Sequence, residues 1–228
     1  RNPNGMTPAD ISVVIPTLNE AESIAAAVDS ALVAGAVDVI VCDGGSTDET
    51  TRLAGRAGAT KVVRSLPGRG IQLNSGAVFA EHTFVLFLHA DNRLDADCLK
   101  QICRHPEAVW GAFRQHIDSP RPIFRALEWG NAARVSLRRM PFGDQAIFVR
   151  RDVFKEQGGF EEIPLMEDVE LSRRLRRVAR PLLLEGKVTI SPRRWHQRGV
   201  IRQTIQNWSI QLSYALGAPA ERLSQRNL

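Results

Sequence analysis

Apolar and polar positions follow two patterns that alternate along the first half of the chain. Short, mostly apolar runs are typical of strands buried on both faces of a sheet, and they occur at residues 11–16, 37–42, 61–63 and 84–88. Helical patterns separate these runs, at residues 21–34, 49–57, 68–80 and 95–104. Alternating strands and helices with short connections predict an α/β fold built on a mostly parallel sheet.

The pattern loosens after residue 109 but continues. Strands are predicted at 109–116, 145–149, 182–184 and 188–190, and helices at 123–137, 150–157, 167–178 and 200–216. No internal repeat or linker-like segment interrupts the series, so we expect a single domain over residues 11–228, with helices flanking its sheet. Residues 1–10 are expected to be a tail, and residues 1–5, which precede Met6, are left out of the fold prediction.

The composition is that of a globular protein with one large core. The chain has 228 residues, 43% of them apolar. No apolar run approaches the roughly 18 residues of a membrane-spanning helix, and no signal peptide opens the sequence. The three cysteines are an odd number without Cys-x-x-Cys spacing, which argues against a disulfide framework or a zinc site. We therefore expect a cytoplasmic protein with reduced thiols.

The charge is spread unevenly. Residues 111–228 carry 21 Lys and Arg against 12 Asp and Glu, whereas residues 1–110 carry 9 against 13. A basic half suits an anionic partner such as nucleotide phosphates or anionic lipid, and the alternative is a solvated, arginine-rich helix face. A nucleic-acid partner is disfavoured, because the basic residues lack interleaved aromatic residues.

Polar residues follow two of the predicted buried strands directly. Open α/β sheets bind ligands at the carboxyl ends of their strands, which is where Asp91 and Asp43 fall. Asp91 is suited to hold a divalent cation or, alternatively, to cap the next helix. Gly44 and Gly45 after Asp43 allow a close backbone approach to a ligand, although the same pattern fits an ordinary turn before a helix. The spacing is not Gly-x-Gly-x-x-Gly, which disfavours a dinucleotide site.

Two segments in this region resemble a known family. Ile-Pro-Thr-Leu-Asn-Glu at residues 15–20, followed by Val-Cys-Asp-Gly-Gly-Ser-Thr-Asp at residues 41–48, resembles the opening of the family-2 glycosyltransferases, which are nucleotide-sugar-dependent enzymes of GT-A fold. The resemblance extends to about residue 180. It implies a nucleotide-binding half at 11–95 and an acceptor and catalytic half at 96–228. It also implies nucleotide-binding roles for residues of both segments: Pro16, Thr17, Asn19, Glu20, Asp43 and Gly44.

The segment 68–76 resembles the glycine-rich helix start that lies beside the nucleotide phosphates in that family. Amide groups at a helix N-terminus together with Arg69 make an anion site. The resemblance places Arg69, Gln72 and Asn74 on the phosphate side of the donor. The alternative is a helix start with a solvated arginine.

His89-Ala90-Asp91 stands where the family has its Asp-x-Asp motif. The resemblance implies that Asp91 holds Mg²⁺ or Mn²⁺, which bridges to the diphosphate of the donor. His89 replaces the first aspartate, either as a weaker Mn²⁺ ligand, as a donor to sugar or phosphate, or as a histidine satisfied at a strand end. His196, in a basic and aromatic cluster at 193–196, is a further candidate metal ligand.

Glu167 and Asp168 open a predicted helix, as the catalytic Glu-Asp pair of the family does. The resemblance implies that Asp168 is the general base that deprotonates the acceptor hydroxyl, so that transfer inverts the anomeric centre. Asp144 and Gln145 resemble residues near the transferred sugar or the acceptor. Alternatively, Glu167 and Asp168 are two acidic residues that complement the helix dipole, and Asp144 and Gln145 belong to a polar turn before a strand.

The sequence as a whole favours an inverting, metal-assisted transfer from a UDP-sugar to an acceptor hydroxyl. A non-catalytic nucleotide-sugar sensor remains open. A sugar-nucleotide nucleotidyltransferase would need a basic phosphate loop after the first strand, and residues 16–20 contain no lysine or arginine.

The last predicted helix carries an apolar stripe. Ile201, Ile205, Trp208, Leu212 and Leu216 recur at helical spacing. The stripe is expected to face the core or a second copy in a homodimer. Alternatively it lies on the inner face of a membrane, which would suit a lipid-linked acceptor.

Overall fold

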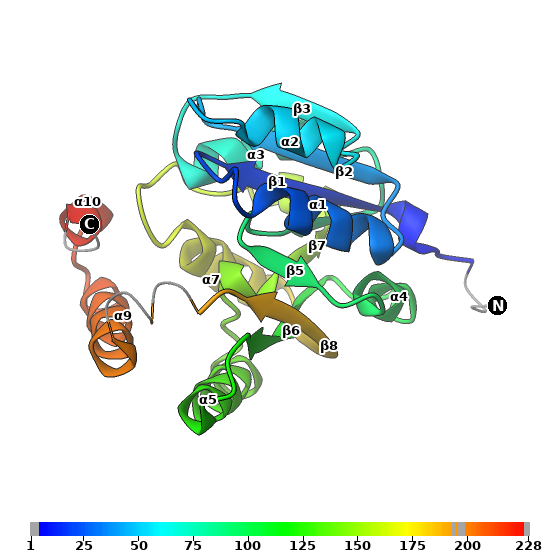
Figure 1. Ribbon diagram of the computed structural model, residues 1–228. Helices are drawn as coiled ribbons and strands as arrows, with labels where there is room; N and C mark the ends of the chain where they lie inside the picture. Colours follow the sequence, from blue (N-terminus) through cyan, green and yellow to red (C-terminus); the bar gives the residue numbers. More distant parts are fainter. Residues whose placement is uncertain (1–4, 193–194, 196–198, 226–228) are drawn as a thin grey trace.

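The computed structural model describes residues 5–192, 195 and 199–225 (Figure 1). Its centre is one eight-stranded sheet in the order β3-β2-β1-β4-β7-β6-β8-β5. The strands are β1 Ile11–Thr17, β2 Asp38–Asp43, β3 Lys61–Arg64, β4 Phe84–Phe87, β5 Asn92–Leu94, β6 Trp110–Ile117, β7 Phe148–Arg150 and β8 Leu182–Ile190. The helices are η1 Pro8–Asp10, α1 Ile24–Val33, α2 Thr50–Arg56, α3 Arg69–Val78, α4 Cys98–Cys103, α5 Pro122–Arg138, η2 Gly143–Gln145, α6 Arg151–Glu156, α7 Glu167–Val178, α9 Val200–Ala215 and α10 Ala220–Gln225.

The sheet is mixed, with parallel pairs in the majority. β1 runs parallel to β2 and β4, β2 to β3, and β6 to β8. The short strand β7 is antiparallel to both β4 and β6, and β5 is antiparallel to β8. The α/β, mostly parallel architecture expected from the sequence is therefore confirmed. Because β7 joins the two parallel groups, residues 11–95 and 96–228 contribute to the same sheet.

The predicted elements agree with the structure, within a few residues at their ends, except at five places. Two helices were not predicted: η1, which lies in the expected tail, and α10, which follows the helix predicted to be the last. The strands predicted at 182–184 and 188–190 are one strand, β8, whose register with β6 shifts after Phe113. The strand predicted from residue 145 begins at Phe148, because residues 143–145 form the 3₁₀ turn η2. The polar strand β5 was not predicted, since Asn92 and Arg93 carry no apolar alternation that would reveal it.

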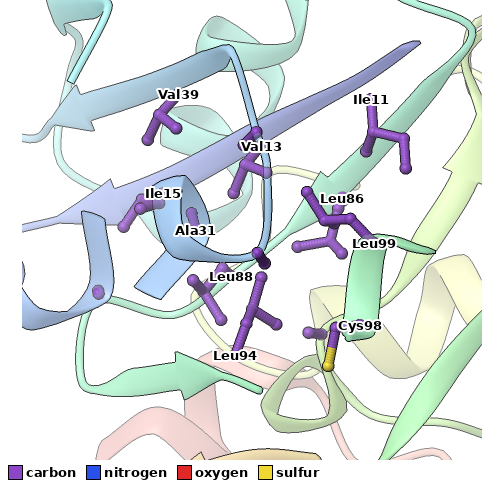
Figure 2. Packing of buried hydrophobic residues seen from close by; sticks show 14 of the residues in the cluster. Ile11, Val13, Ile15, Ala31, Val39, Leu86, Leu88, Leu94, Cys98 and Leu99 are labelled. Carbon is purple, nitrogen blue, oxygen red and sulfur yellow. The ribbon is translucent and has the colours of Figure 1, made fainter. Parts of the chain in front are cut away.

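The core explains why the first strands read as apolar runs. Every residue of β1, β2 and β4 is buried, because helices cover both faces of this part of the sheet. On one face, side chains of β1 and β4 pack with those of α1 and α4, including Leu86, Leu88, Cys98 and Leu99 (Figure 2). On the other face, Val14, Val85 and Phe87 pack with side chains of α3, α6 and α7.

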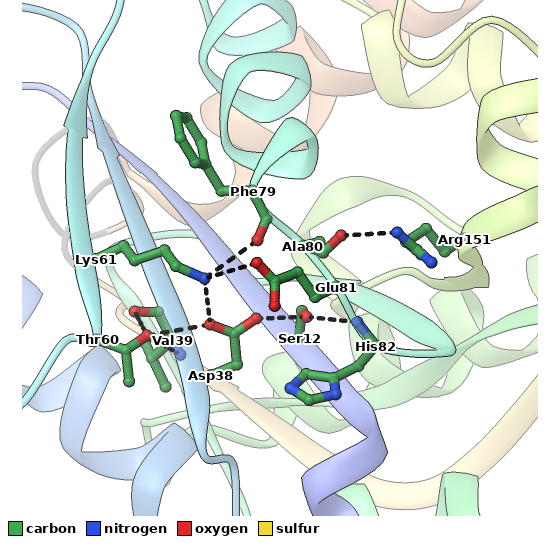
Figure 3. Close-up of polar contacts among 10 residues, drawn as sticks. All are labelled: Ser12, Asp38, Val39, Thr60, Lys61, Phe79, Ala80, Glu81, His82 and Arg151. Atoms are coloured by element: carbon green, nitrogen blue, oxygen red, sulfur yellow. Dashed lines mark hydrogen bonds and ion pairs between the residues drawn. The ribbon is translucent and has the colours of Figure 1, made fainter.

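A polar network closes the amino-terminal end of β2, at the edge of the sheet opposite Asp43 (Figure 3). The buried carboxylate of Asp38 accepts a hydrogen bond from Ser12 Oγ at 2.6 Å and from Thr60 Oγ1 at 3.2 Å. Lys61 Nζ lies 3.4 Å from Asp38 Oδ1 and 3.9 Å from Glu81 Oε1. These contacts tie β1, β2 and β3 together away from the ligand-binding edge.

Replacing Ser12 with alanine is expected to lower the free energy of unfolding by about 1–2 kcal/mol. The variant removes a buried donor and leaves Asp38 Oδ2 without it. Urea unfolding at pH 7 measures the change. The matched control is Ser209→Ala, since Ser209 is exposed and donates only to a carbonyl of its own helix at 2.9 Å. Equal midpoints for the two variants would contradict the prediction.

The C-terminal helix α9 corrects one sequence prediction. Ile205, Leu212 and Leu216 are 60%, 62% and 79% exposed, so the reading of these residues as core-facing is wrong. The readings as a dimer or membrane surface stay predictions. In the described ranges, no helix is both long and apolar enough to cross a bilayer. His196 lies outside the described residues, as do the side chains of Ile201 and Trp208.

Candidate active site

Two loops at the carboxyl ends of β1 and β2 are joined by hydrogen bonds. Asn19 has a left-handed backbone (φ 53°), and its N–H donates to Ser46 Oγ at 2.8 Å. Its side-chain Oδ1 accepts from Thr47 N at 2.9 Å. The Glu20 N–H donates to Thr50 Oγ1 at 2.8 Å. Asn19 and Glu20 thus shape the walls of the expected nucleotide site, and asparagine is one of the few residue types that adopts this backbone readily.

Asp43 is fully buried at the end of β2, and its carboxylate is used by its own loop. It accepts hydrogen bonds from Gly45 N at 3.0 Å, from Ser46 N at 2.9 Å and from Ser46 Oγ. Asp43 therefore stabilises its own turn in this structure, as the alternative prediction of an ordinary turn before a helix implies. Its contact with a nucleotide base stays a prediction.

Gln72 links the first helix turn of α3 to both strand ends. Its Nε2 donates to Thr17 O at 2.7 Å and to Cys42 O at 3.1 Å, and Gly44 N donates to Thr17 O at 2.9 Å. A Cβ on Gly44 would lie 3.0 Å from the Gln72 side chain, so glycine is required for this approach. Gln72 fixes the position of the strand ends, since its amide donors go to backbone carbonyls. Pro16 lies within β1, paired with Cys42.

Thr17, the last residue of β1, has a buried side-chain hydroxyl at the same end of the sheet. The residue is 2% exposed, and its Oγ1 has no hydrogen-bond partner among the described residues. Buried hydroxyl groups are normally satisfied, so an unsatisfied one beside a ligand-binding edge is a candidate ligand contact. This agrees with the nucleotide-binding role that the sequence predicts for Thr17.

Arg69 begins α3 and reaches the start of α7. Its Nη1 lies 3.0 Å from Oε1 of Glu167, whose side chain is 1% exposed. Burial raises the pKa of Glu167, and the charge of Arg69 opposes that rise. Burial also lowers the pKa of Arg69, but Glu167, Asp168 and Asp91 together raise it above its ordinary value. The predicted phosphate-side arginine and the predicted catalytic pair are therefore in contact.

Asp168 is held by a glycine that the sequence analysis did not single out. Gly143 N donates to Asp168 Oδ2 at 2.6 Å. A Cβ on Gly143 would lie 3.1 Å from Asp168 Oδ2 and 2.8 Å from His89 Nε2, so the carboxylate and the imidazole meet at this residue. His89, at the end of β4, is thus beside the predicted base. Only the tertiary contact reveals the role of Gly143.

The remaining carboxylates gather around the same place. Asp91 and Asp168 both act on Arg69, and both raise the pKa of Asp144, although burial is the larger cause of that rise. Asp144 Oδ1 is buried without a hydrogen-bond partner in the described structure. Asp91 and Asp168, which are far apart in the sequence, therefore both lie close enough to act on the charges of Arg69 and of Asp144.

Gln145 has a different role from its neighbour. It is fully buried, and its Oε1 accepts from Arg134 Nη2 at 2.9 Å and from Phe142 N at 3.2 Å. Its Nε2 donates to Phe113 O at 3.3 Å. Because both ends of the amide are used inside the protein, Gln145 positions the 142–145 turn. Its contact with sugar or acceptor stays a prediction.

Asn74 also has a positioning role. Its Nδ2 donates to Phe160 O at 2.9 Å, and its Oδ1 accepts from Phe160 N at 2.8 Å. This pair of bonds ties α3 to the segment that leads into α7. A Cβ on Gly159 (φ +72°) would lie 2.6 Å from Asn74 Oδ1, which leaves room for glycine alone. The contact of Asn74 with phosphate stays a prediction.

Replacing Asn74 with alanine is expected to lower the free energy of unfolding by about 2 kcal/mol. Both backbone groups of the buried residue Phe160 lose their partner. Chemical unfolding measures the loss. Limited proteolysis should show faster cleavage between residues 156 and 166, since the loop is released from α3. An unchanged unfolding midpoint would show that the segment is held by other contacts.

The residues present are suited to bind a divalent cation whose remaining ligands come from a substrate. In the part of the chain that the structure describes, no three His, Cys, Asp or Glu side chains form a metal-ligand cluster. Mg²⁺ in enzymes is commonly bound by one or two carboxylates together with substrate phosphates. Asp91 at the end of β4 and the unpartnered Asp144 Oδ1 have the chemistry for that arrangement.

A family model decides the classification. The model for glycosyl transferase family 2 matches residues 12–158, which is more than half of the chain. The chain belongs to this family. The matched range holds Asp43, Arg69, Asp91 and Asp144, whereas Asp168 lies ten residues beyond it.

Curated relatives of this family-2 member are similar over shorter stretches. An uncharacterized glycosyltransferase of Mycobacterium tuberculosis is 38% identical over 92 residues, 40% of this chain and 41% of that protein. Glycosyltransferase AglJ of Haloferax volcanii is 38% identical over 91 residues, 40% of this chain and 30% of that protein. The chain thus spans less than half the length of these two relatives.

Solved structures show the fold of the family-2 chain. S. aureus TarS, in complex with UDP-GlcNAc, has a TM-score of 0.61 at 20% identity, over 79% of this chain and 58% of TarS. Glucosyl-3-phosphoglycerate synthase from Mycobacterium tuberculosis, in complex with Mg²⁺ and UDP, has a TM-score of 0.56 at 20% identity, over 82% and 70% of the two chains. The GT-A fold expected from the sequence is confirmed.

Proposed function

We propose that this protein transfers a sugar from a nucleoside diphosphate donor, a UDP-sugar, to an acceptor hydroxyl with inversion. One observation carries the proposal. Two carboxylates, Asp168 at the start of α7 and Asp91 after β4, both act on the charge of Arg69, and Gly143 N holds Asp168 Oδ2 at 2.6 Å. A base, a cation ligand and an anion partner are the groups that such a transfer needs.

The donor is proposed to lie against the loops that follow β1 and β2. Thr17 Oγ1 is the unpartnered polar atom there, and Arg69 lies on the side towards Asp91. Two proteins of the same fold, TarS and the phosphoglycerate synthase, are described with UDP-GlcNAc and with UDP and Mg²⁺. Their ligands support UDP as the nucleotide.

Asp168 is proposed to remove the proton from the acceptor hydroxyl. The acceptor oxygen then forms a bond to the anomeric carbon, while the bond from that carbon to the diphosphate oxygen breaks on the opposite face. The hydrogen bond from Gly143 N fixes one carboxylate oxygen, Oδ2, and thereby orients the base. A hydrogen-bonded carboxylate at a fixed position is what general-base catalysis needs.

Arg69 is proposed to stabilise the negative charge that develops on the leaving diphosphate. Its Nη1 is held by Glu167, and its side chain is 39% exposed, so the guanidinium is also accessible from solvent. Glu167 then acts as the positioning residue for Arg69. Mg²⁺ or Mn²⁺ held by Asp91 would supply further charge neutralisation at the diphosphate.

A panel of nucleotide sugars tests the proposal. The purified protein should release UDP slowly from one UDP-sugar, with water as the acceptor, and should release no nucleotide from GDP- or dTDP-sugars. EDTA should abolish the release, and Mn²⁺ or Mg²⁺ should restore it, since without the cation the carboxylate of Asp91 repels the diphosphate instead of binding it through the metal. Tight binding of UDP without any turnover would instead favour a nucleotide-sugar sensor.

A further inference from the structure

A cavity of about 340 Å³ opens between α5, the segment after it, α7 and α9. Figure 1 shows α5 and α9 as the two helices farthest from the β1–β3 side of the sheet. Four arginines line the cavity: Arg134, Arg138, Arg173 and Arg176. No acidic residue lines it. The donor side, described above, is built from the opposite half of the sheet, and none of these arginines was assigned to it.

The floor of the cavity is apolar and aromatic. Phe142, Met166 and Val169 line it, together with Tyr214 from α9. The guanidinium of Arg134 lies 3.3 Å from the ring centre of Phe142, and that of Arg173 lies 4.8 Å from the ring centre of Tyr214. When an arginine stacks on an aromatic ring, its N–H groups point outward in the plane of the guanidinium, where they are available to an anion.

The four arginines have no ion-pair partner within 4.0 Å among the described residues. Neighbouring arginines on the same helices are paired, Arg125 with Glu128 and Arg174 with Glu170. Arg134 Nε is buried with no hydrogen-bond partner in the described part of the chain. Burial lowers the pKa of Arg134 to about 10, although the charges of Asp144 and Asp168 oppose that fall, and the like charge of Arg138 adds a smaller lowering. Gathered cations of this kind are stabilised when an anion binds.

The inner end of the cavity lies near the proposed base. Met166 and Val169, which line it, flank the Glu167-Asp168 pair in sequence. The charge of Asp168 acts on Arg134 and on Tyr214, so the cavity and the carboxylate are neighbours. Asp168 does not itself line the cavity, but its Oδ2 accepts from Gly143 N at 2.6 Å, directly after the lining residue Phe142. A molecule that extends past Phe142 and Met166 would therefore approach the atom that is proposed to accept a proton.

We propose that this cavity is the acceptor site and that the acceptor is an anionic amphiphile. A phosphate or carboxylate group binds the arginines, an apolar body covers Phe142 and Val169, and a hydroxyl reaches Asp168. The assignment as an acceptor site rests on the proposed transferase function. The binding of an anionic amphiphile is a property of the cavity itself and is measurable without any donor.

Calorimetric titration with octyl phosphate, below its micelle concentration, tests the binding. Octyl phosphate should bind at least about tenfold more tightly than inorganic phosphate or octanol, because it satisfies both the arginines and the apolar floor. Arg173→Gln and Arg176→Gln should each weaken binding by about tenfold, the effect of one lost charged hydrogen bond. Arg56→Gln, at an exposed arginine of α2, is the matched control and should bind as the wild type does.

Vesicles of phosphatidylcholine with phosphatidic acid distinguish the two sources of such a ligand. Arginine-dependent binding to vesicles and to octyl phosphate indicates an acceptor held in a membrane, whereas binding to octyl phosphate alone indicates a free molecule. Octyl phosphate that binds no better than inorganic phosphate, or equally to the Arg173→Gln and Arg176→Gln proteins, overturns the proposal. UDP release without such binding refutes the cavity assignment alone, and arginine-dependent binding without any UDP release refutes only the transferase function.

Discussion

Asp168→Asn is expected to lower the rate of UDP release by about 10³-fold, within the range attributed to general-base catalysis. Asparagine has nearly the same shape as aspartate and still offers an oxygen to Gly143 N, which donates at 2.6 Å in the structure. The variant therefore keeps the local hydrogen bond but loses the ability to take a proton. Turnover of the UDP-sugar found in the donor panel measures the effect.

The binding of UDP separates the loss of a base from the loss of the fold. UDP affinity and the thermal midpoint of Asp168→Asn should both stay close to the wild-type values, because the donor side is formed by β1, β2 and α3. Asp152→Asn is the matched control, since Asp152 lies in the first turn of a helix, α6, and pairs with Arg150 at the surface. If Asp168→Asn retains a tenth or more of the wild-type rate, the proposed base is wrong.

Arg69→Gln is expected to lower the free energy of unfolding by about 3 kcal/mol at neutral pH. The change leaves Glu167, 1% exposed, without its charged partner at 3.0 Å. Breaking a buried ion pair by removing one partner costs about 3–5 kcal/mol. We expect the lower end of that range, because the Arg69 side chain is 39% exposed and water reaches it.

The loss should depend on pH in a defined direction. Burial already raises the pKa of Glu167 above its ordinary value, and Arg69 limits that rise. Without Arg69 the pKa rises further, so the folded state holds a proton that the unfolded state releases. Stability contributed in this way is present at acid pH and is lost as the pH rises through the folded-state pKa. Urea unfolding at pH 5 and pH 8 should therefore show the larger loss at pH 8.

A second substitution checks the cause of this loss. Glu167→Gln added to Arg69→Gln should recover most of the stability and should flatten the pH dependence, because no unpaired charge remains buried. Arg52→Gln is the control, since Arg52 and Glu49 form an exposed pair whose loss should cost less than about 1 kcal/mol. Equal destabilisation by Arg52→Gln and Arg69→Gln would contradict the role given to the buried pair.

Local sequence predicted the elements well wherever burial leaves a mark on the chain. Strands β1, β2 and β4 are covered on both faces, so each contains a run of apolar residues and stands out. Strand β5 lies at the edge of the sheet and begins Asn92-Arg93, so it leaves no such mark. The sequence also did not reveal that β7 lies between β4 and β6 and runs antiparallel to both, because a strand of three residues carries too little pattern to indicate its neighbours.

The candidate site was likewise predicted only in part from the sequence. The sequence pointed to carboxylates at strand and helix ends, and in the structure Asp91 and Asp168 both lie close enough to act on the charges of Arg69 and Asp144. The sequence did not distinguish residues that face a ligand from residues that hold the scaffold. Gln72, Asn74 and Gln145 are polar residues next to the site, and each hydrogen-bonds to backbone groups of another segment.

The sequence by itself determined the class of fold, the family and the residue types available for chemistry, because strand burial and short motifs are local properties of the chain. The tertiary structure alone decided which of those residues meet. It placed Gly143 N on Asp168, buried Glu167 against Arg69, and gathered Arg134 and Arg173 around one cavity. Such contacts join segments far apart in the chain, and the side-chain partners that result depend on packing that no local pattern records.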